Sequence, residues 1–288
     1  MSVPTGALPS SGAENNRGGT RLRPGATLIA GIVITGTIIM LAVFAPLVTA
    51  HSPTAQDLGG GLAAPSARHL LGTDQLGRDL WSRVVYAART DLSVGVLAVL
   101  APLVIGTVLG VVSGYFGGLA DRAIGLLTDT VMAFPFYVIV LALVAVLGAG
   151  QFSIYVALAL VAWVNYARVI RNVTKGFLAE NWVIAAHGGG LSRSRVIVRH
   201  ILPNAIPQLI VLAVTDVVFV ILAVVTLSYL GLGIQPPTPD WGTMISDGRS
   251  FITTQWWISF FPGLAVLLTG IGFSLLADGL ADLYRDSA

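Results

Sequence analysis

The stretch at residues 181–204, NWVIAAHGGGLSRSRVIVRHILPN, is polar and basic and separates two long apolar runs. The pair Ala185-Ala186 is followed by Gly190, which tolerates the positive φ of a sharp turn. Pro203 suits the first turn of a helix, where its missing N–H is not needed. The basic residues between them are Arg193, Arg195, Arg199 and His200. We therefore expect a loop that couples a membrane-spanning chain to something outside the membrane; the competing interpretation is an ordinary basic loop held at the membrane face by charge.

Composition identifies the class of protein. Of the 288 residues, 55% are hydrophobic and 10% are charged, and the mean hydropathy is +0.83. Soluble domains average about 25% charged residues, so we expect an integral membrane protein. The absence of cysteine excludes disulfides and thiolate metal sites. The single lysine, Lys175, does not stand in a GxxxxGK[ST] loop, so we expect no ATP site of that kind and no bound cofactor.

Six apolar runs are long enough to cross a bilayer, which takes about 20 helical residues. They predict an all-α membrane protein with six transmembrane helices at residues 27–48, 92–115, 123–147, 152–174, 207–230 and 260–277. The first run is longer than the apolar core of a cleavable signal peptide, so we expect it to be retained.

The three long segments between these runs are expected to form two external loops and one cytoplasmic loop. Residues 50–90 predict an external loop with an amphipathic helix at 79–89, in which charges at Asp74, Arg78 and Asp79 have a structural role in preference to substrate contact. The five-helix core at 91–280 includes a cytoplasmic coupling loop at 177–204 and an external loop at 231–256.

Positive charge sets the expected orientation, because cytoplasmic loops are enriched in Lys and Arg. Residues 1–25, rich in Ser, Gly, Pro and Asn, predict a disordered cytoplasmic tail, and residues 281–288 are expected to form a cytoplasmic tail at the C-terminus. With both termini inside, only five of the sixteen Lys and Arg residues are external, namely Arg68, Arg78, Arg83, Arg89 and Arg249. The acids available to pair with four of them are Asp74, Asp79 and Asp91. The small net charge of +2 is no sign of nucleic-acid binding.

Four strings resemble one family of transporters. Residues 181–204 resemble the Glu-Ala-Ala loop of binding-protein-dependent ABC importer permeases, which ends in HILPN in the peptide-permease group. Residues 71–79 (LGTDQLGRD) resemble that group's LGTDxLGRD segment, and residues 228–242 (SYLGLGIQPPTPDWG) resemble FLGLGxQPPxPxWG. Residues 278–282 (DGLAD) match DGLxD. The resemblance therefore extends over most of the chain.

The loop departs from the family pattern at two places. Ile184 replaces the usual acid, which removes a possible ion pair with an ATPase. Gly188-Gly189 precede the expected glycine, and each interior glycine weakens a helix by about 1 kcal/mol. We therefore expect a docking helix that is either short or formed only against its partner.

The resemblance implies the permease subunit of an ATP-driven importer of dipeptides or oligopeptides, with the type I ABC importer permease fold, in a bacterial-type cytoplasmic membrane. The implied partners are a second related permease, two ATPase subunits or one dual ATPase that use ATP and Mg, and an external substrate-binding protein. No residue of this chain is expected to be catalytic. The implied coupling residues are Ala185, Ala186, Gly190, Arg193, Arg195, Arg199 and Pro203.

Other residues are candidates for the translocation path and the outer face. Asp129 and Asp216 are ionisable residues inside predicted spans, which are costly and often functional. Pro135 is expected to kink its helix, and a packing and gating role is favoured there over ligand binding. Asp216 could equally face the path, the cytoplasmic vestibule or a partner permease. The predicted contacts with the binding protein are Gln235, Pro236, Pro237 and Trp241.

Three alternatives stay open. The same machinery could import another solute, such as nickel or a nickel chelate, glutathione or haem. A proton-coupled secondary transporter would need a relay of intramembrane acids or histidines, for which only Asp129 and Asp216 are candidates. A membrane enzyme or metal site is disfavoured, because the histidines show no ligand spacing such as HExxH; they are His51, His69, His187 and His200.

Overall fold

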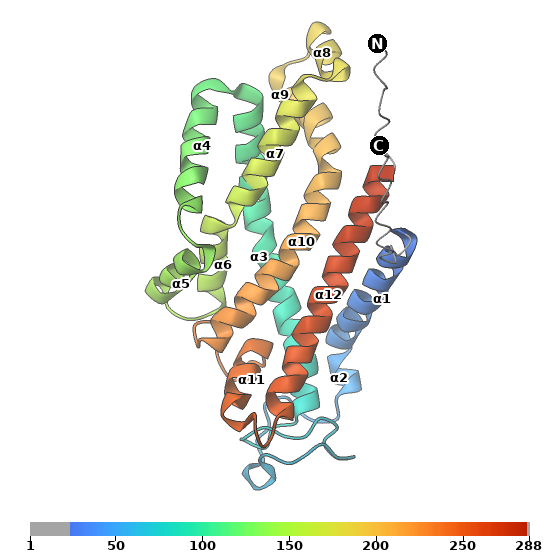
Figure 1. Cartoon of the computed structure of the whole chain (residues 1–288), viewed down its shortest axis with the longest axis vertical. Helices are drawn as coiled ribbons and strands as arrows, with labels where there is room; N and C mark the ends of the chain where they lie inside the picture. Colours follow the sequence, from blue (N-terminus) through green and yellow to red (C-terminus); the bar gives the residue numbers. More distant parts are fainter. Residues whose placement is uncertain (1–23, 287–288) are drawn as a thin grey trace, which may run out of the picture.

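The computed structural model describes residues 24–286 as a bundle of helices (Figure 1). Within this range the only extended pairing is an isolated bridge between Thr73 and Asp79. The all-α prediction is thereby confirmed. The predicted tail at 1–25 lies, up to residue 23, outside the described residues, as do residues 287 and 288.

Five continuous helical segments are long and apolar enough to cross a membrane. The first is α1 (Pro24–Val43), followed after Phe44 by the single turn α2 (Ala45–Val48). The second is α3 (Leu80–Phe116), and the third comprises α6 (Gln151–Val161) and α7 (Trp163–Leu178). The fourth comprises α9 (Arg193–Val196), the π turn η2 (Ile197–Ile201) and α10 (Leu202–Tyr229). The fifth is α12 (Trp257–Asp286).

The span predicted at residues 123–147 is bent in the middle. It consists of α4 (Gly118–Met132) and α5 (Phe136–Leu147), which meet at 85°. Pro135 stands immediately before α5 with ψ near 130°, and its ring cannot donate the N–H that a continuous helix requires. The predicted kink at Pro135 is confirmed, and the pair counts as a sixth span only if both halves are taken together.

Helix α3 begins earlier than predicted. The carboxylate of Asp79 accepts hydrogen bonds from Ser82 N and Ser82 Oγ, both at 2.8 Å, and so caps the helix. No break separates this cap from Phe116, and Pro102 is accommodated inside the helix. The helix expected at 79–89 is therefore present, but it belongs to the following span, since these residues form the first three turns of α3.

Glycines set the contact between α3 and α7. Gly106, Gly110 and Gly114 lie on one face of α3 against the backbone of α7. A Cβ atom on Gly110 would lie 2.7 Å from Ala167 O, and one on Gly114 would lie 2.7 Å from Arg171 O. This confirms the close packing that small residues at this spacing predict.

Helices α1 and α12 lie side by side at the other edge of the bundle (Figure 1). Gly279, in the DGLAD string, lies against the backbone of Leu28, where a Cβ atom would come within 2.6 Å of Leu28 Cα. Helix α12 continues to Asp286, so most of the residues predicted as a C-terminal tail form its last turns.

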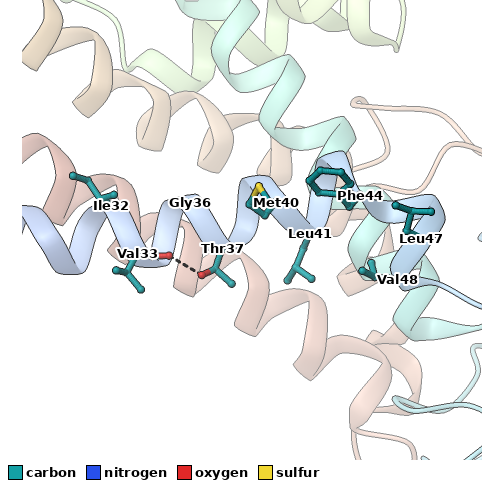
Figure 2. Close-up of a pocket in the computed structure, with 9 residues that line it drawn as sticks. All are labelled: Ile32, Val33, Gly36, Thr37, Met40, Leu41, Phe44, Leu47 and Val48. Carbon is teal, nitrogen blue, oxygen red and sulfur yellow. Dashed lines mark hydrogen bonds between the residues drawn. The ribbon is translucent and has the colours of Figure 1, made fainter.

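The outer face of α1 and α2 forms a shallow apolar groove (Figure 2). The hydroxyl of Thr37 donates to Val33 O at 2.7 Å, so its polar group is satisfied inside the helix. This face suits lipid chains, because it presents almost no unpaired polar group to them. Its lining residues are Ile32, Val33, Gly36, Thr37, Met40, Leu41, Phe44, Leu47 and Val48.

Other connections complete the two ends of the bundle. At the end near α8 (Asn181–Gly188), short turns join α7 to α10 (Figure 1). At the opposite end lie the loop of residues 50–79, with the short η1 (Leu58–Gly60), and the helix α11 (Trp241–Gly248) followed by η3 (Arg249–Phe251). The predicted external loop at 231–256 thus contains a helix.

Candidate functional site

The coupling stretch contains a short helix, α8, that is closed by a Schellman motif. Leu191 N donates to Ala186 O at 3.3 Å, and Gly190 N donates to His187 O at 3.0 Å. Gly190 has φ +79°, the left-handed conformation that this motif requires. The predicted turn at Gly190 is confirmed. The helix before it is short, and it is formed in this chain without a partner.

One face of α8 is open to solvent. Ala185 is exposed, Ala186 is half-buried, and the Ile184 side chain is 57% exposed. Nothing lies within 4 Å of the position that a Cβ atom would take on Gly190. An exposed isoleucine beside small residues forms an apolar surface that allows close approach of another backbone. The position where the family carries an acid therefore offers apolar contact in place of an ion pair.

The buried face of α8 joins it to the spans. Val183, Val196 and Ile201 form a small core under the helix. The ring of His187 makes a 2.7 Å hydrogen bond with the hydroxyl of Tyr115, in the last turn of α3. This contact was not predicted from the sequence, because Tyr115 and His187 are 72 positions apart. This hydrogen bond thus connects α8 directly to α3.

The basic run leads from α8 into α10. Arg193, Arg195 and Arg199 are all exposed, and none forms an ion pair with a carboxylate in the described part of the chain. In the π turn, Leu202 N donates to Ile197 O, five residues back. Pro203 follows in the first turn of α10, as predicted, directly after the π turn.

An ion-pair cluster around Asp121 lies at the same end of the bundle. Asp121 on α4 accepts hydrogen bonds from the Arg171 guanidinium, from Lys175 Nζ at 2.8 Å and from Ser113 Oγ. The cluster joins α3, α4 and α7. The sequence indicated only a turn near Asp121, because its cationic partners are 50 and 54 positions away.

Replacing Asp121 by Asn is expected to destabilise the chain by about 1–3 kcal/mol, because two cations lose their counter-charge. The partial solvation of Arg171 and Lys175 keeps the effect at the low end of that range. Thermal unfolding in lipid nanodiscs measures it. Asp129→Asn is the matched control, since Asp129 is 74% exposed and lies 3.6 Å from Arg168; we expect a change within about 0.5 kcal/mol. Equal effects of both variants would refute a structural role for the Asp121 cluster.

The two acids predicted for the path differ in their surroundings. Asp129 lies on the open side of α4, beside a small polar pocket that also includes Thr128, Arg168 and Arg171. Asp216 is buried on α10, next to the phenol of Tyr166 on α7. The structure therefore supplies Asp216 with a neighbour inside its own chain, whereas Asp129 stays accessible.

The predicted binding-protein contact is wrong for Trp241. Its side chain is 1% exposed, its indole N–H donates to Val84 O at 3.1 Å, and its backbone N–H donates to Asp91 Oδ2 at 3.0 Å. These bonds fix the start of α11 against α3. Gln235, Pro236 and Pro237 are exposed on the loop before it and stay candidates for that contact.

Asp240 also stabilises the start of α11. Its carboxylate accepts from Gly242 N and Thr243 N and caps α11. Burial raises the pKa of the Asp240 carboxyl, and these hydrogen bonds to the charged form partly offset the shift. Asp91, which was a predicted partner for an external arginine, bonds to the Trp241 backbone instead.

The LGTDQLGRD string forms a buried network. Asp74 Oδ2 lies 2.6 Å from Arg78 Nε and 3.4 Å from Arg83 Nε, and Arg78 reaches Asp247 of α11 at 3.6 Å. The structural role predicted for these charges is confirmed, because they tie the loop to both α3 and α11. Asp79 pairs with histidines and not with an arginine.

Known proteins resemble this chain over most of its length. Residues 106–286 match the family described as binding-protein-dependent transport system inner membrane component. The dipeptide transport system permease protein DppC of Alkalihalophilus pseudofirmus is 38% identical over 262 residues, 91% of this chain and 86% of that protein. The probable D,D-dipeptide transport system permease protein DdpC of Escherichia coli is 39% identical, over 90% and 87%. The nickel transport system permease protein NikC of Escherichia coli is 37% identical, over 87% and 91%.

Proposed function

Because this chain belongs to the family of binding-protein-dependent transport system inner membrane components, we propose that it is the permease subunit of an ATP-driven importer of dipeptides or oligopeptides. The observation that carries the coupling role is α8, a preformed helix with an exposed apolar face of small residues at one end of the spans. The relatives named for dipeptides support the substrate class.

The proposed mechanism is alternating access driven from α8. ATP binding closes two ATPase subunits, or one dual ATPase, against which α8 is seated. The contact between His187 and Tyr115 passes the movement to α3, and the core under α8 passes it to α10. Helices α3 and α7 follow together because glycines on α3 bring the two backbones into close contact. ATP and Mg are used by the partner subunits.

The remaining partners are assigned to the two ends of the helical bundle. We place α8 and both termini on the cytoplasmic side, and α11 with the loop of residues 50–79 outside, in a bacterial-type membrane. A second related permease completes the path, and the exposed residues Gln235, Pro236 and Pro237 contact a substrate-binding protein. The exposed arginines bind headgroups or acidic residues of the ATPase; they are Arg193, Arg195 and Arg199.

Nickel or a nickel chelate is the second candidate substrate, because one relative is named a nickel transport permease at nearly the same identity. Substrate choice therefore needs a direct test. The complete transporter is reconstituted in liposomes with its binding protein, and uptake of labelled dipeptides, longer peptides and a nickel chelate is measured. We expect uptake of a peptide that requires ATP and the loaded binding protein. Uptake of the nickel chelate alone would overturn the peptide assignment, and uptake driven by a proton gradient without ATP would overturn the importer mechanism.

A further inference from the structure

Three metal-ligating side chains meet at the end of the bundle opposite α8. His51 follows α2, His69 lies in the loop before α3, and Asp79 is the capping residue of α3. One ligand atom from each lies within 4.8 Å of the other two. The residues are 18 and 10 positions apart, so no ligand spacing was visible in the sequence. We propose that His51, His69 and Asp79 form a binding site for a divalent transition-metal ion.

Hydrogen bonding accounts for only one of the two contacts that Asp79 makes with these histidines. Asp79 Oδ1 lies 2.9 Å from His69 Nδ1 and 3.8 Å from His51 Nδ1. The second distance is too long for a hydrogen bond. Ligand atoms around a tetrahedral ion with bonds of about 2.0–2.2 Å are separated by about 3.3–3.6 Å. The His51–Asp79 distance is close to that value, and the His69–Asp79 distance is shorter because these two groups are hydrogen-bonded; small side-chain rotations that break this bond bring the two nitrogens and the oxygen around one ion.

The carboxylate of Asp79 is divided between two roles. Its Oδ2 accepts both hydrogen bonds from Ser82, at the start of α3, which fixes the orientation of the whole group. Its Oδ1 points toward the two imidazoles, and His69 is its only hydrogen-bond partner in the described structure. A ligand oxygen that is held in place by a second interaction is typical of protein metal sites.

The site is open enough for an ion to enter. The His51 side chain is 37% exposed and that of His69 is 17% exposed, whereas Asp79 is 3% exposed. The two rings are 4.9 Å apart at a tilt of 34°, so both nitrogens can approach one point without a clash. The ion would therefore be reached from solvent on the histidine side and would rest on a rigid carboxylate.

The donor set selects the kind of ion. Two imidazole nitrogens and one carboxylate oxygen suit Zn²⁺, Co²⁺, Ni²⁺ or Cu²⁺, whereas Mg²⁺ and Ca²⁺ prefer oxygen ligands throughout. Three protein ligands leave at least one coordination position for water or another group. A bound ion would join the outer end of the first span to the start of α3. This chain alone supplies the three ligands.

Zinc binding to the full chain in lipid nanodiscs tests this site. The protein is purified through a tag without histidine, and binding is measured by isothermal titration and by the absorption spectrum of Co²⁺ as a probe. We expect one Zn²⁺ per chain and a tetrahedral or five-coordinate Co²⁺ spectrum. His51→Gln and His69→Gln are each expected to weaken binding roughly tenfold or more.

The matched control is His200→Gln, which removes a histidine at the opposite end of the bundle and should bind Zn²⁺ like the unmodified chain. His51→Gln keeps the hydrogen bond between His69 and Asp79, so its thermal unfolding without metal should be unchanged. Added Zn²⁺ should raise the unfolding temperature of the unmodified chain but not that of this variant. Absence of saturable binding at millimolar Zn²⁺, or binding that survives either substitution intact, would overturn the site.

Discussion

Replacing Gly190 by Trp is expected to lower ATP-driven uptake roughly tenfold or more, corresponding to loss of a coupling free energy of about 1–3 kcal/mol. The reason is geometric. Gly190 ends α8 at φ +79°, and a side chain there would project into open space, where the proposed ATPase groove closes around the helix. A bulky indole would hold the two surfaces apart. Peptide-stimulated ATP hydrolysis and uptake are measured together in liposomes, so that uncoupling is distinguished from loss of assembly.

Gly190→Ala is the control for this variant. Alanine accepts the same left-handed backbone at a cost of about 1–2 kcal/mol but adds only one methyl group. We expect it to keep most of the uptake. If Ala and Trp impair uptake equally, backbone conformation and not steric access to α8 is responsible. If Trp leaves uptake normal, α8 is not the surface that meets the ATPase.

Replacing Gly110 by Leu is expected to abolish most of the folded protein, with a cost of about 3 kcal/mol or more. A Cβ atom at this position would lie 2.7 Å from Ala167 O and 2.9 Å from Ile170 Cβ. Neither neighbour can rotate away, since one is backbone and the other is attached directly to it. The helices α3 and α7 would have to separate along their whole contact. Monodispersity in size-exclusion chromatography and thermal unfolding in nanodiscs are the measurements.

Gly176→Ala tests whether any added side chain in this region is harmful. Gly176 lies on α7 itself, and nothing lies within 4 Å of the position of its Cβ atom. Alanine there should be neutral or should stabilise the helix by up to about 1 kcal/mol. A graded series in which Gly110→Ala falls between the unmodified chain and Gly110→Leu would support the close-packing explanation. A Gly110→Leu variant that unfolds like the unmodified chain would contradict it.

Several functional features could be predicted because they depend on neighbours in the chain. The bend at Pro135, the turn at Gly190 and the place of Pro203 each follow from the covalent structure of one residue. The spacing of Gly106, Gly110 and Gly114 indicated a close helix contact, since residues four apart share one face of a helix. The short helix α8 was predicted from the local pattern of residues 181–204.

Features that join distant segments could not be predicted. Nothing near Asp121 indicates that Arg171 and Lys175 will meet it, and Tyr115 gives no sign of its bond to His187. Trp241 was assigned to the surface because it stands in the predicted external loop at 231–256. Its burial depends on the packing of α11 against α3, which exists only in the folded chain.

The sequence by itself determined the membrane class, the helical segments, their turns and the family, because hydropathy, proline, glycine and local motifs act within a few residues. Only the tertiary structure decided which charges pair, that α3 runs unbroken from Asp79, and that His51, His69 and Asp79 converge. The physical reason is that the energy of an ion pair or a packed side chain depends on a partner's position in space. That position is set by the packing of whole helices, which no single stretch of residues specifies.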